Sequence, residues 1–443
     1  DYMKVYRGTS KVVLFPNSTE QISQILKHCH ENKIAVVPQS GNTGLVGGST
    51  PVHDEIVIHM GKFNKIINFD EISETLHCES GVVLENLNQY LGERGYTPPV
   101  DLGAKGSCYI GGNISTNAGG IHFIKFGSLR KNVKGIKAVL ANGEIIDCMN
   151  PLPKNNTGYD LKHMFIGSEG TLGIVTECLL NCFPIPQYKT LSIMKLKSFD
   201  DILKVYTEAK KLFGESVYAM EFFDEDSLYL QVKHNNQKNP FNEDTLDRTK
   251  PKAFYLLLEI GNHKENQEDM MNFIEQLSEE ELLEDAVIPE DNTKTREIWE
   301  LRESILESTV KAGPSVAYDV SLSLDKFYYL VEKIQEFSSK KNFFAHGYGH
   351  IGDYNLHINI VDMDPDFNKR NDFSRVQAFK KEVEKELFGY IHSINGSISA
   401  EHGIGRQKTK FLHYTQPQLN IDLMKSIKKT YDPNGILNPY KIL

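Results

Sequence analysis

The chain lacks long hydrophobic runs and an excess of positive charge. Its apolar stretches are short, for example Ile34–Val37, whereas a helix needs about 20 apolar residues to cross a bilayer. Lysine and arginine together number 49, and aspartate and glutamate 59, which gives a net charge of −10 over 443 residues. Such an acidic chain is poorly suited to bind the phosphate backbone of nucleic acids. We therefore expect no membrane span and no nucleic-acid partner.

Closely spaced cysteine pairs are also missing. All six cysteines lie in the first 182 residues, and no two of them form a CxxC motif. The nearest pair is Cys178 and Cys182. This pattern predicts buried, reduced thiols rather than a zinc cluster or a disulfide framework. The sequence begins at Asp1, so a targeting segment cannot be read from it.

The composition is that of an ordinary globular protein, with 40% hydrophobic and 24% charged residues. At about 150 residues per domain, the length predicts two or three domains. Residues 1–185 are rich in glycine and predict an α+β region, with one helix from the cap Ser18 to Asn32 and another at Val82–Glu93. The strands expected in this region are Ile34–Pro38, Glu55–His59, Thr75–Glu79, Lys134–Leu140 and Gly173–Leu180.

Residues 186–412 contain less glycine and alternate strands with long helices. This alternation favours an antiparallel sheet with helices packed on one face. The polar stretch Lys233–Lys250 predicts an exposed loop, and residues 413–443 predict a helix, Pro417–Thr430, followed by a turn. The strands expected between 186 and 412 are Leu191–Leu196 and Ala253–Ile260, and the helices are Asp200–Phe213, Glu265–Leu283, Thr295–Lys311 and Asp325–Lys340.

Two long loops carry the same Gly/Asn/Ser/Thr chemistry. Residues 38–49 read PQSGNTGLVGGS, and residues 106–120 read GSCYIGGNISTNAGG. Glycine lets the backbone come close to a ligand, and successive amides can line an anion-binding nest. A single loop would favour a plain tight turn, whereas two favour a dinucleotide site. The GxGxxG fingerprint with a distal acid and the GKS/GKT of a P-loop are both missing, which argues against a nicotinamide Rossmann site and a P-loop nucleotidase.

Longer motifs carry a family resemblance. The stretches PQSGNTGLVGG, DLGAKGSCYIGGNISTNAGG and NTGYDLKHMFIGSEGTLGIVT resemble the FAD domain of vanillyl-alcohol-oxidase-type flavoenzymes. Near the C-terminus, ISAEHGIGRQK and DPNGILNPYK resemble the D-2-hydroxyglutarate dehydrogenases more than the D-lactate dehydrogenases. The resemblance implies an α+β fold with an FAD-binding domain of two subdomains over 1–185. It also implies an antiparallel-sheet substrate and metal domain over 186–412, and a small helical segment, 413–443, that packs on the FAD domain.

The resemblance further implies which residues contact the flavin. Relatives with covalent flavin have a histidine in the first loop, where this chain has Ser40–Asn42, so we expect non-covalent FAD. The matching positions are Pro38, Gly41, Asn42, Thr43, Gly44, Leu45, Gly48, Ser49, Asp101, Gly106, Ser107, Gly111, Gly112, Asn113, Thr116, Asn117, Gly120, Glu169, Gly170, Gly173, Ile174 and Asn438.

Two compact motifs contain four side chains that suit a metal site. His350 and His357 flank a Gly-Asp turn, and Glu401 and His402 are adjacent. Three ligands and a spare base suit a catalytic zinc ion with an open position. The alternative is that His357 and Glu401 form a structural hydrogen-bonded pair. We favour the metal site, because four suitable residues occur in two short motifs.

The resemblance assigns a role to each of these residues. It makes His350, His357 and Glu401 the ligands of a divalent metal, His402 the general base, and Asn359 a substrate contact. This is consistent in chemical terms, because a bound metal lowers the pKa of a substrate hydroxyl, a histidine can remove the proton, and the C2 hydride can pass to flavin N5.

Three positions near the expected substrate site depart from the family pattern. Arg302 stands where the family has a carboxylate-binding arginine, a role that suits a guanidinium group, although by residue type alone it would be a solvated charge on a helix face. One helical turn later the chain has Leu306 instead of threonine, and Ala317 replaces a lysine. Tyr354 replaces a glycine, which is strained if the position needs a positive φ. These changes predict altered or weakened recognition of 2-hydroxyglutarate.

The leading hypothesis is an FAD- and zinc-dependent dehydrogenase that oxidises a D-2-hydroxy acid to the 2-oxo acid. D-2-hydroxyglutarate is the first candidate substrate, and D-lactate or D-malate the second. The resemblance implies a mitochondrial location, in the matrix, and an electron acceptor such as an electron-transferring flavoprotein, a quinone or a cytochrome. A homodimer or a larger assembly is compatible with it. The alternative is a catalytically weakened flavin-binding structural or regulatory subunit, in which FAD stabilises the fold.

Overall fold

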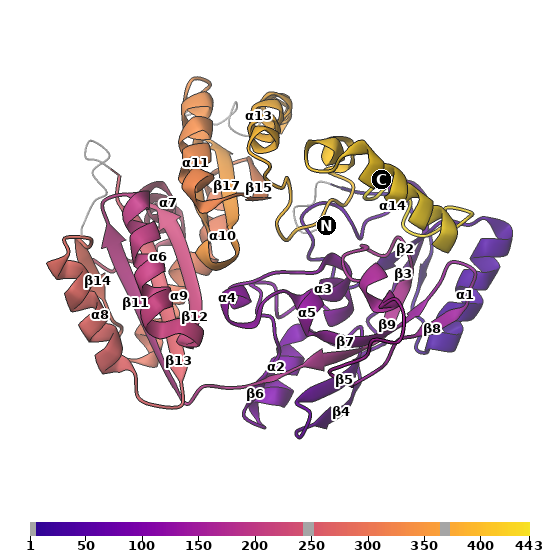
Figure 1. Ribbon diagram of the computed structural model, residues 1–443. Coiled ribbons are helices and arrows are strands. Elements are labelled where there is room, and N and C mark those ends of the chain that lie inside the picture. The colour runs from indigo at the N-terminus through magenta and orange to yellow at the C-terminus, as the bar shows by residue number, and fades with distance from the viewer. Residues whose placement is uncertain (1–5, 242–251, 364–372) are drawn as a thin grey trace. The chain divides into compact units, whose positions relative to one another are not determined.

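The computed structural model describes residues 6–241, 252–363 and 373–443, which form two compact units (Figure 1). The first unit comprises the described residues up to His122 together with Phe126–Ile185 and Glu401–Leu443. The second comprises Phe123–Lys125 and Pro186–Ala400. No helix within the described ranges is long and apolar enough to cross a membrane.

The first unit contains two main sheets. Three parallel strands have the order β1-β3-β2, and five antiparallel strands have the order β4-β5-β9-β7-β8; β10 and β6 form a short pair. The strands are β1 (Val13–Leu14), β2 (Val36–Gln39), β3 (Ile56–His59), β4 (Ile66–Asp70), β5 (Thr75–Glu79), β6 (Tyr96–Thr97), β7 (Val133–Val139), β8 (Ile145–Asp147), β9 (Ile174–Asn181) and β10 (Phe183–Pro184). The helices are α1 (Thr19–Asn32), α2 (Leu84–Gly92), α3 (Ile110–Thr116), α4 (Phe123–Phe126, which crosses into the second unit), α5 (Leu129–Asn132), η1 (Leu161–Met164), η4 (Thr409–Tyr414) and α14 (Gln418–Tyr431).

Helix α1 forms where the sequence predicts it. Ser18 is its N-cap, and the Ser18 side chain accepts a hydrogen bond from the Gln21 amide. Ile22, Leu26 and Cys29 recur at helical spacing and are buried. The helix ends at Lys33, which adopts a left-handed conformation with φ 54°. Five of the six cysteines are buried and Cys148 is half-buried, all of them as free thiols.

The second unit is built on one antiparallel sheet of seven strands, in the order β14-β11-β13-β12-β16-β17-β15. The strands are β11 (Tyr188–Leu196), β12 (Val217–Asp224), β13 (Phe254–Asn262), β14 (Asp285–Val287), β15 (Ser315–Ser321), β16 (Phe343–His350) and β17 (Asn355–Asp362). The helices are α6 (Phe199–Phe213), η2 (Gly214–Ser216), α7 (Glu225–Asn235), α8 (Gln267–Glu279), α9 (Asn292–Glu303), α10 (Ile305–Ala312), α11 (Leu324–Ser339), η3 (Ile351–Asp353) and α13 (Phe373–Ser393). Of the predicted loop Lys233–Lys250, the first residues end α7 and residues 242–250 lie outside the described ranges.

Helices cover both faces of this sheet, so the expectation of helices on one face was wrong. Adjacent strand residues point to opposite faces, and on β12 both Phe222 and Phe223 are buried. Phe222 packs against Phe199 of α6 and Phe327 of α11. Phe223 belongs instead to a core shared with α7, α9 and α10. Strand β12 is therefore covered on both faces, and its nearly continuous apolar run is typical of such a strand.

The helix predicted at Thr295–Lys311 is two helices, α9 and α10, which meet at Ser304. Gln231 explains the break. Its Nε2 donates to the Leu301 carbonyl at 2.8 Å and to Ser304 Oγ at 3.0 Å. The Leu301 carbonyl is the one that Ile305 would bond in a continuous helix, and a side chain inserted into this ladder kinks it.

Residues 401–412 belong to the first unit, although the sequence-based boundary placed them in the second. Contacts made by their backbone account for this. The amides of Ile404 and Gly405 each donate to the Glu169 carboxylate at 2.7 Å. The amide of Arg406 donates to the Val46 carbonyl at 2.9 Å.

Candidate active site

The glycine-rich loops meet within the first unit. A Cβ atom added to Gly41 would lie 1.9 Å from the carbonyl oxygen of Ser107, so the first and second loops touch through a backbone that only glycine permits. Gly170, with φ 73°, packs in the same way against the ring of Pro38, where an added Cβ would lie 2.5 Å from Cγ. The first loop therefore contacts both others, although they are far apart in sequence.

Asn438 brings the C-terminal tail to the same place. Its Nδ2 donates to the carbonyls of Gly48 at 2.9 Å and Glu169 at 2.7 Å, and its amide donates to the Val36 carbonyl at 2.8 Å. Its Oδ1 is buried and has no hydrogen-bond partner among the described residues. A buried acceptor without a partner is costly unless a ligand supplies a donor.

The sequence-predicted flavin residues all lie in this unit. An added Cβ at Gly44 or Gly106 would meet no atom of the described structure within 4 Å, which leaves the backbone open to a cofactor. Asn42 and Asn117 have positive φ values of 54° and 50°, as asparagine tolerates. By element, Pro38 is in β2; Gly41, Asn42, Thr43, Gly44, Leu45, Gly48 and Ser49 follow β2; Asp101, Gly106 and Ser107 precede α3; Gly111, Gly112, Asn113 and Thr116 are in α3; Asn117 and Gly120 follow it; Glu169, Gly170 and Gly173 precede β9; Ile174 begins β9; and Asn438 follows α14.

Glu169 holds the segment that carries Glu401 and His402. Both of its carboxylate oxygens accept main-chain amides from Ile404 and Gly405, and burial raises the pKa of this carboxyl group. The Glu169 carboxylate, which the resemblance assigned to flavin contact, is thus hydrogen-bonded to the backbone of Ile404 and Gly405. In the same unit His402 Nε2 lies 3.7 Å from Glu401 Oε1.

In the second unit, three of the predicted residues share one face of the sheet. On β17, His357 and Asn359 are two residues apart and point to the same side. Strand register places His350 of β16 opposite Asn355, and Ala317 of β15 opposite Asn359, on this same side. Antiparallel pairing therefore places the two predicted metal-binding histidines, the predicted substrate contact Asn359 and the substituted position Ala317 on one face of the sheet.

Glu221 of β12 is a residue of this face that the sequence analysis missed. It is fully buried and pairs in register with His350. Its Oε1 lies 2.7 Å from His350 Nδ1, and its Oε2 lies 2.6 Å from Arg302 Nη2. Glu221 thus joins a predicted metal ligand to the predicted carboxylate binder. The available signal was a single charge inside the apolar run Val217–Phe223.

The two histidines are arranged so that a metal ion can be held. Glu221 is an acceptor when ionised, so His350 Nδ1 carries the hydrogen and His350 Nε2 has the lone pair. That Nε2 lies 3.4 Å from Nε2 of His357, with the two rings nearly perpendicular at 81°.

Arg302 is a buried residue, not the solvated helix-face charge that its residue type alone suggested. Its exposed fraction is 4%, and its guanidinium carbon lies 4.8 Å from the centre of the Tyr348 ring. Its Nε has no hydrogen-bond partner in the described part of the chain. A buried guanidinium with an unused donor suits an anionic ligand.

Asn359 lies at the end of a buried hydrogen-bonded chain. Its Nδ2 lies 3.4 Å from Thr309 Oγ1 and 3.2 Å from the Tyr348 hydroxyl, and its Oδ1 has no partner among the described residues. Thr309 Oγ1 lies 2.9 Å from His346 Nε2, and His346 Nδ1 lies 2.8 Å from Ser227 Oγ. Burial lowers the pKa of His346 to about 3, so the ring is neutral and carries one hydrogen.

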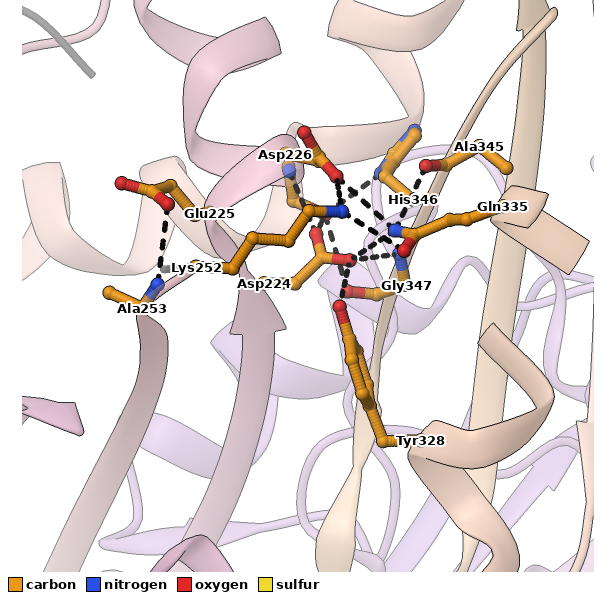
Figure 2. A network of polar contacts seen from close by, with 11 residues as sticks. Asp224, Glu225, Asp226, Lys252, Ala253, Tyr328, Gln335, Ala345, His346 and Gly347 are labelled. Carbon is orange, nitrogen blue, oxygen red and sulfur yellow. Dashed lines mark hydrogen bonds and ion pairs between the residues drawn. The ribbon is translucent and has the colours of Figure 1, made fainter. Parts of the chain in front are cut away.

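The other end of the chain is Asp224, which Figure 2 shows among its partners. Asp224 accepts from the Ser227 amide and hydroxyl, from the Gly347 amide and from the Tyr328 hydroxyl, all within 3.0 Å. Since Ser227 gives its hydrogen to Asp224, it accepts from His346 Nδ1. His346 Nε2 is then an acceptor that faces the Thr309 hydroxyl, which also lies 2.9 Å from the Ile305 carbonyl. Burial raises the pKa of Asp224 to about 7, with the nearby charge of Asp226 acting in the same direction.

Comparisons with known proteins identify the family of the chain. A family model described as "FAD binding domain" matches residues 10–149, and one described as "FAD linked oxidases, C-terminal domain" matches residues 185–442. Mitochondrial D-2-hydroxyglutarate dehydrogenases of Danio rerio and Arabidopsis thaliana are 41% and 42% identical over 100% of this chain, and the matches cover 80% and 77% of those proteins. The chain belongs to the D-2-hydroxyglutarate dehydrogenase family. It is therefore an FAD-dependent oxidoreductase, as the sequence predicted.

Solved structures share the fold at low sequence identity. A p-cresol methylhydroxylase matches with a TM-score of 0.74 and 17% identity, and a 4-ethylphenol oxidase from Gulosibacter chungangensis with 0.73 and 18%. Each match covers 97% of this chain and 88% of the other. They confirm the predicted fold class, an α+β fold that includes an antiparallel sheet. A Saccharomyces cerevisiae relative, 38% identical over 100% of this chain and 88% of its own length, is named a D-2-hydroxyglutarate–pyruvate transhydrogenase.

The departures from the family pattern can now be placed. Leu306 is half-buried in α10, beyond the break that separates it from Arg302 in α9. Tyr354 has φ 64°, so the position does require the left-handed conformation, and its side chain is 44% exposed. A bulky residue held there costs about 1–2 kcal/mol.

Proposed function

We propose that the protein oxidises a D-2-hydroxy acid to the corresponding 2-oxo acid, with FAD as the electron acceptor. D-2-hydroxyglutarate is the first candidate, and D-lactate or D-malate follow. The observation that carries this proposal is the buried face on which Glu221 joins Arg302 to His350, beside His357 and Asn359. The names of the relatives point to the same substrate class.

A zinc ion is the second part of the proposal. Zinc–nitrogen bonds of about 2.0–2.1 Å in tetrahedral geometry place two imidazole nitrogens about 3.4 Å apart, which is the separation of the two Nε2 atoms. A histidine whose other nitrogen donates to a carboxylate is also the usual arrangement for a metal ligand. The sequence adds Glu401 as the third ligand.

Each group then has a chemical task. Arg302 binds the substrate carboxylate through its unused donor, and Asn359 contacts the substrate from the same sheet face. His402 takes the hydroxyl proton on an imidazole nitrogen in its neutral form. When bound, FAD supplies the hydride acceptor at N5 and zinc supplies Lewis acidity. The two electrons leave the substrate with the C2 hydrogen, which balances the conversion to the 2-oxo acid.

We propose non-covalent FAD, held by the three glycine loops and Asn438. The orphaned Oδ1 of Asn438 and the open backbone at Gly44 and Gly106 support this placement. Reduced flavin would pass its electrons to an electron-transferring flavoprotein, a quinone or a cytochrome. The mitochondrial location implied by the resemblance agrees with the names of the relatives.

Anaerobic mixing of the FAD- and zinc-loaded protein with D- and L-2-hydroxy acids tests the proposal. Rapid bleaching of the flavin by one D-acid, and not by its L-enantiomer, is the expected result and identifies the substrate. If no acid bleaches the flavin, the dehydrogenase proposal fails. The changes at Leu306, Ala317 and Tyr354 then favour the second candidate, a flavin-binding structural or regulatory subunit.

A further inference from the structure

Glu221 lies in surroundings where an ionised carboxylate has a high free energy. All eight residues of β12 are buried, and Glu221 itself is fully buried. An ionised carboxylate in such surroundings requires close partners for its charge. Among the described residues it has two, one on each oxygen: His350 at 2.7 Å and Arg302 at 2.6 Å.

The two partners of Glu221 have different proposed tasks. His350, together with His357, is proposed to bind the metal ion, whereas Arg302 is proposed to bind the substrate carboxylate. A single negative charge therefore acts on both. It fixes the hydrogen of His350 on Nδ1, which leaves Nε2 as the donor atom to a metal and raises its basicity. It also offsets the charge of Arg302, because a buried ion pair weakens the attraction of either member for a third charge.

We propose that Glu221 is a positioning residue that strengthens metal binding at His350 and weakens anion binding at Arg302. This inference rests on the proposed function, since it concerns the same site. Glu221 touches neither substrate nor cofactor in this account and acts through its two neighbours. Weaker anion binding at Arg302 is useful, because the product is itself a carboxylate anion and must leave Arg302 after each turnover.

The opposite signs of the two effects make the proposal testable. Glu221→Gln removes the charge and keeps an oxygen that can accept from His350 Nδ1. We expect the dissociation constant of zinc, measured by competition with a chelator, to rise about tenfold, within the range for loss of such outer partners. We expect the dissociation constants of 2-oxoglutarate and pyruvate for the zinc-free, FAD-loaded protein to fall about tenfold. The flavin absorbance spectrum reports binding of 2-oxoglutarate and pyruvate without turnover.

Glu259→Gln is the matched control. Glu259 is a buried carboxylate on the neighbouring strand β13, on the same face, and it accepts from Trp299 Nε1 of α9 at 3.3 Å. This variant should leave both dissociation constants within about twofold of the wild type. A general loosening of the unit by loss of a buried charge would affect the two variants alike.

Several outcomes overturn the proposal. Movement of the zinc and 2-oxo acid constants in the same direction, or no movement of either, contradicts it, as does a wild-type protein that binds neither ligand. If Glu221→Gln does not fold, Glu221→Asp keeps the charge, and the expected result is weaker zinc binding with an unchanged 2-oxo acid constant. A wild type that binds both ligands but is reduced by no hydroxy acid refutes the dehydrogenase, while the comparison of the two constants still decides the role of Glu221.

Discussion

The hydroxyl of Thr309 links Asn359 to the interior of the second unit, and its removal has a calculable cost. Thr309→Val keeps the shape of the side chain and deletes the hydroxyl, whose oxygen lies 2.9 Å from both His346 Nε2 and the Ile305 carbonyl. No other donor reaches this nitrogen in the described ranges, and both side chains are fully buried. An orphaned buried acceptor costs about 1–3 kcal/mol. We therefore expect the free energy of unfolding to fall by about 2 kcal/mol.

Thermal unfolding of the FAD-loaded protein measures this cost. For a unit of about 200 residues, 2 kcal/mol corresponds to a fall in Tm of about 4–8 °C. The measurement belongs at pH 8, above the pKa of Asp224 of about 7, where the direction of the chain is fixed by an ionised carboxylate. Ser308→Ala is the matched control, because within the described part of the chain Ser308 Oγ donates only to the Ile305 carbonyl of its own helix.

A double-variant cycle isolates the interaction itself. If the loss comes from the orphaned nitrogen, Thr309→Val combined with His346→Phe removes both partners and costs less than the sum of the single changes. The expected coupling is about 1–2 kcal/mol. Additive effects, or a Thr309→Val variant as stable as Ser308→Ala, would refute the hydrogen-bonded chain.

Three further predictions concern charge, catalysis and specificity. In the native state the pKa of Asp224 is raised from 3.8 to about 7. Between these pH values the native state binds one proton more than the unfolded state, so the free energy of unfolding falls as pH rises. Asp224→Asn should reduce that fall by up to about 4 kcal/mol, as measured by unfolding from pH 4 to 8. His402→Ala should abolish flavin reduction by the substrate while FAD stays bound, and reduction at the wild-type rate would exclude His402 as the base. Leu306→Thr combined with Ala317→Lys should raise kcat/KM for D-2-hydroxyglutarate at least about tenfold if the pocket lacks a second cation besides Arg302. No gain would mean that the anion is held by other residues.

Local patterns predicted the secondary structure well where one face of an element is apolar. Helix α1 has its cap at Ser18 and buries Ile22, Leu26 and Cys29, as its periodicity predicts. The prediction of one helix over Thr295–Lys311 failed because the break depends on Gln231, which is about 70 residues away in sequence and takes the Leu301 carbonyl. A contact of that kind leaves no trace in local periodicity.

The sequence by itself determined the family, and it singled out the glycine loops and the two histidines as candidate site residues, because these are properties of short motifs. Only the tertiary structure decided how the site is built. Antiparallel register placed Ala317 beside Asn359 and His350 beside Glu221, and packing against the sheet buried Arg302. An isolated glutamate in an apolar strand and an isolated arginine on a helix have no meaning as a pair until the fold brings their charges within 2.6 Å. The free energy of a buried charge depends on its close neighbours, and these neighbours are set by the tertiary structure rather than by the local sequence.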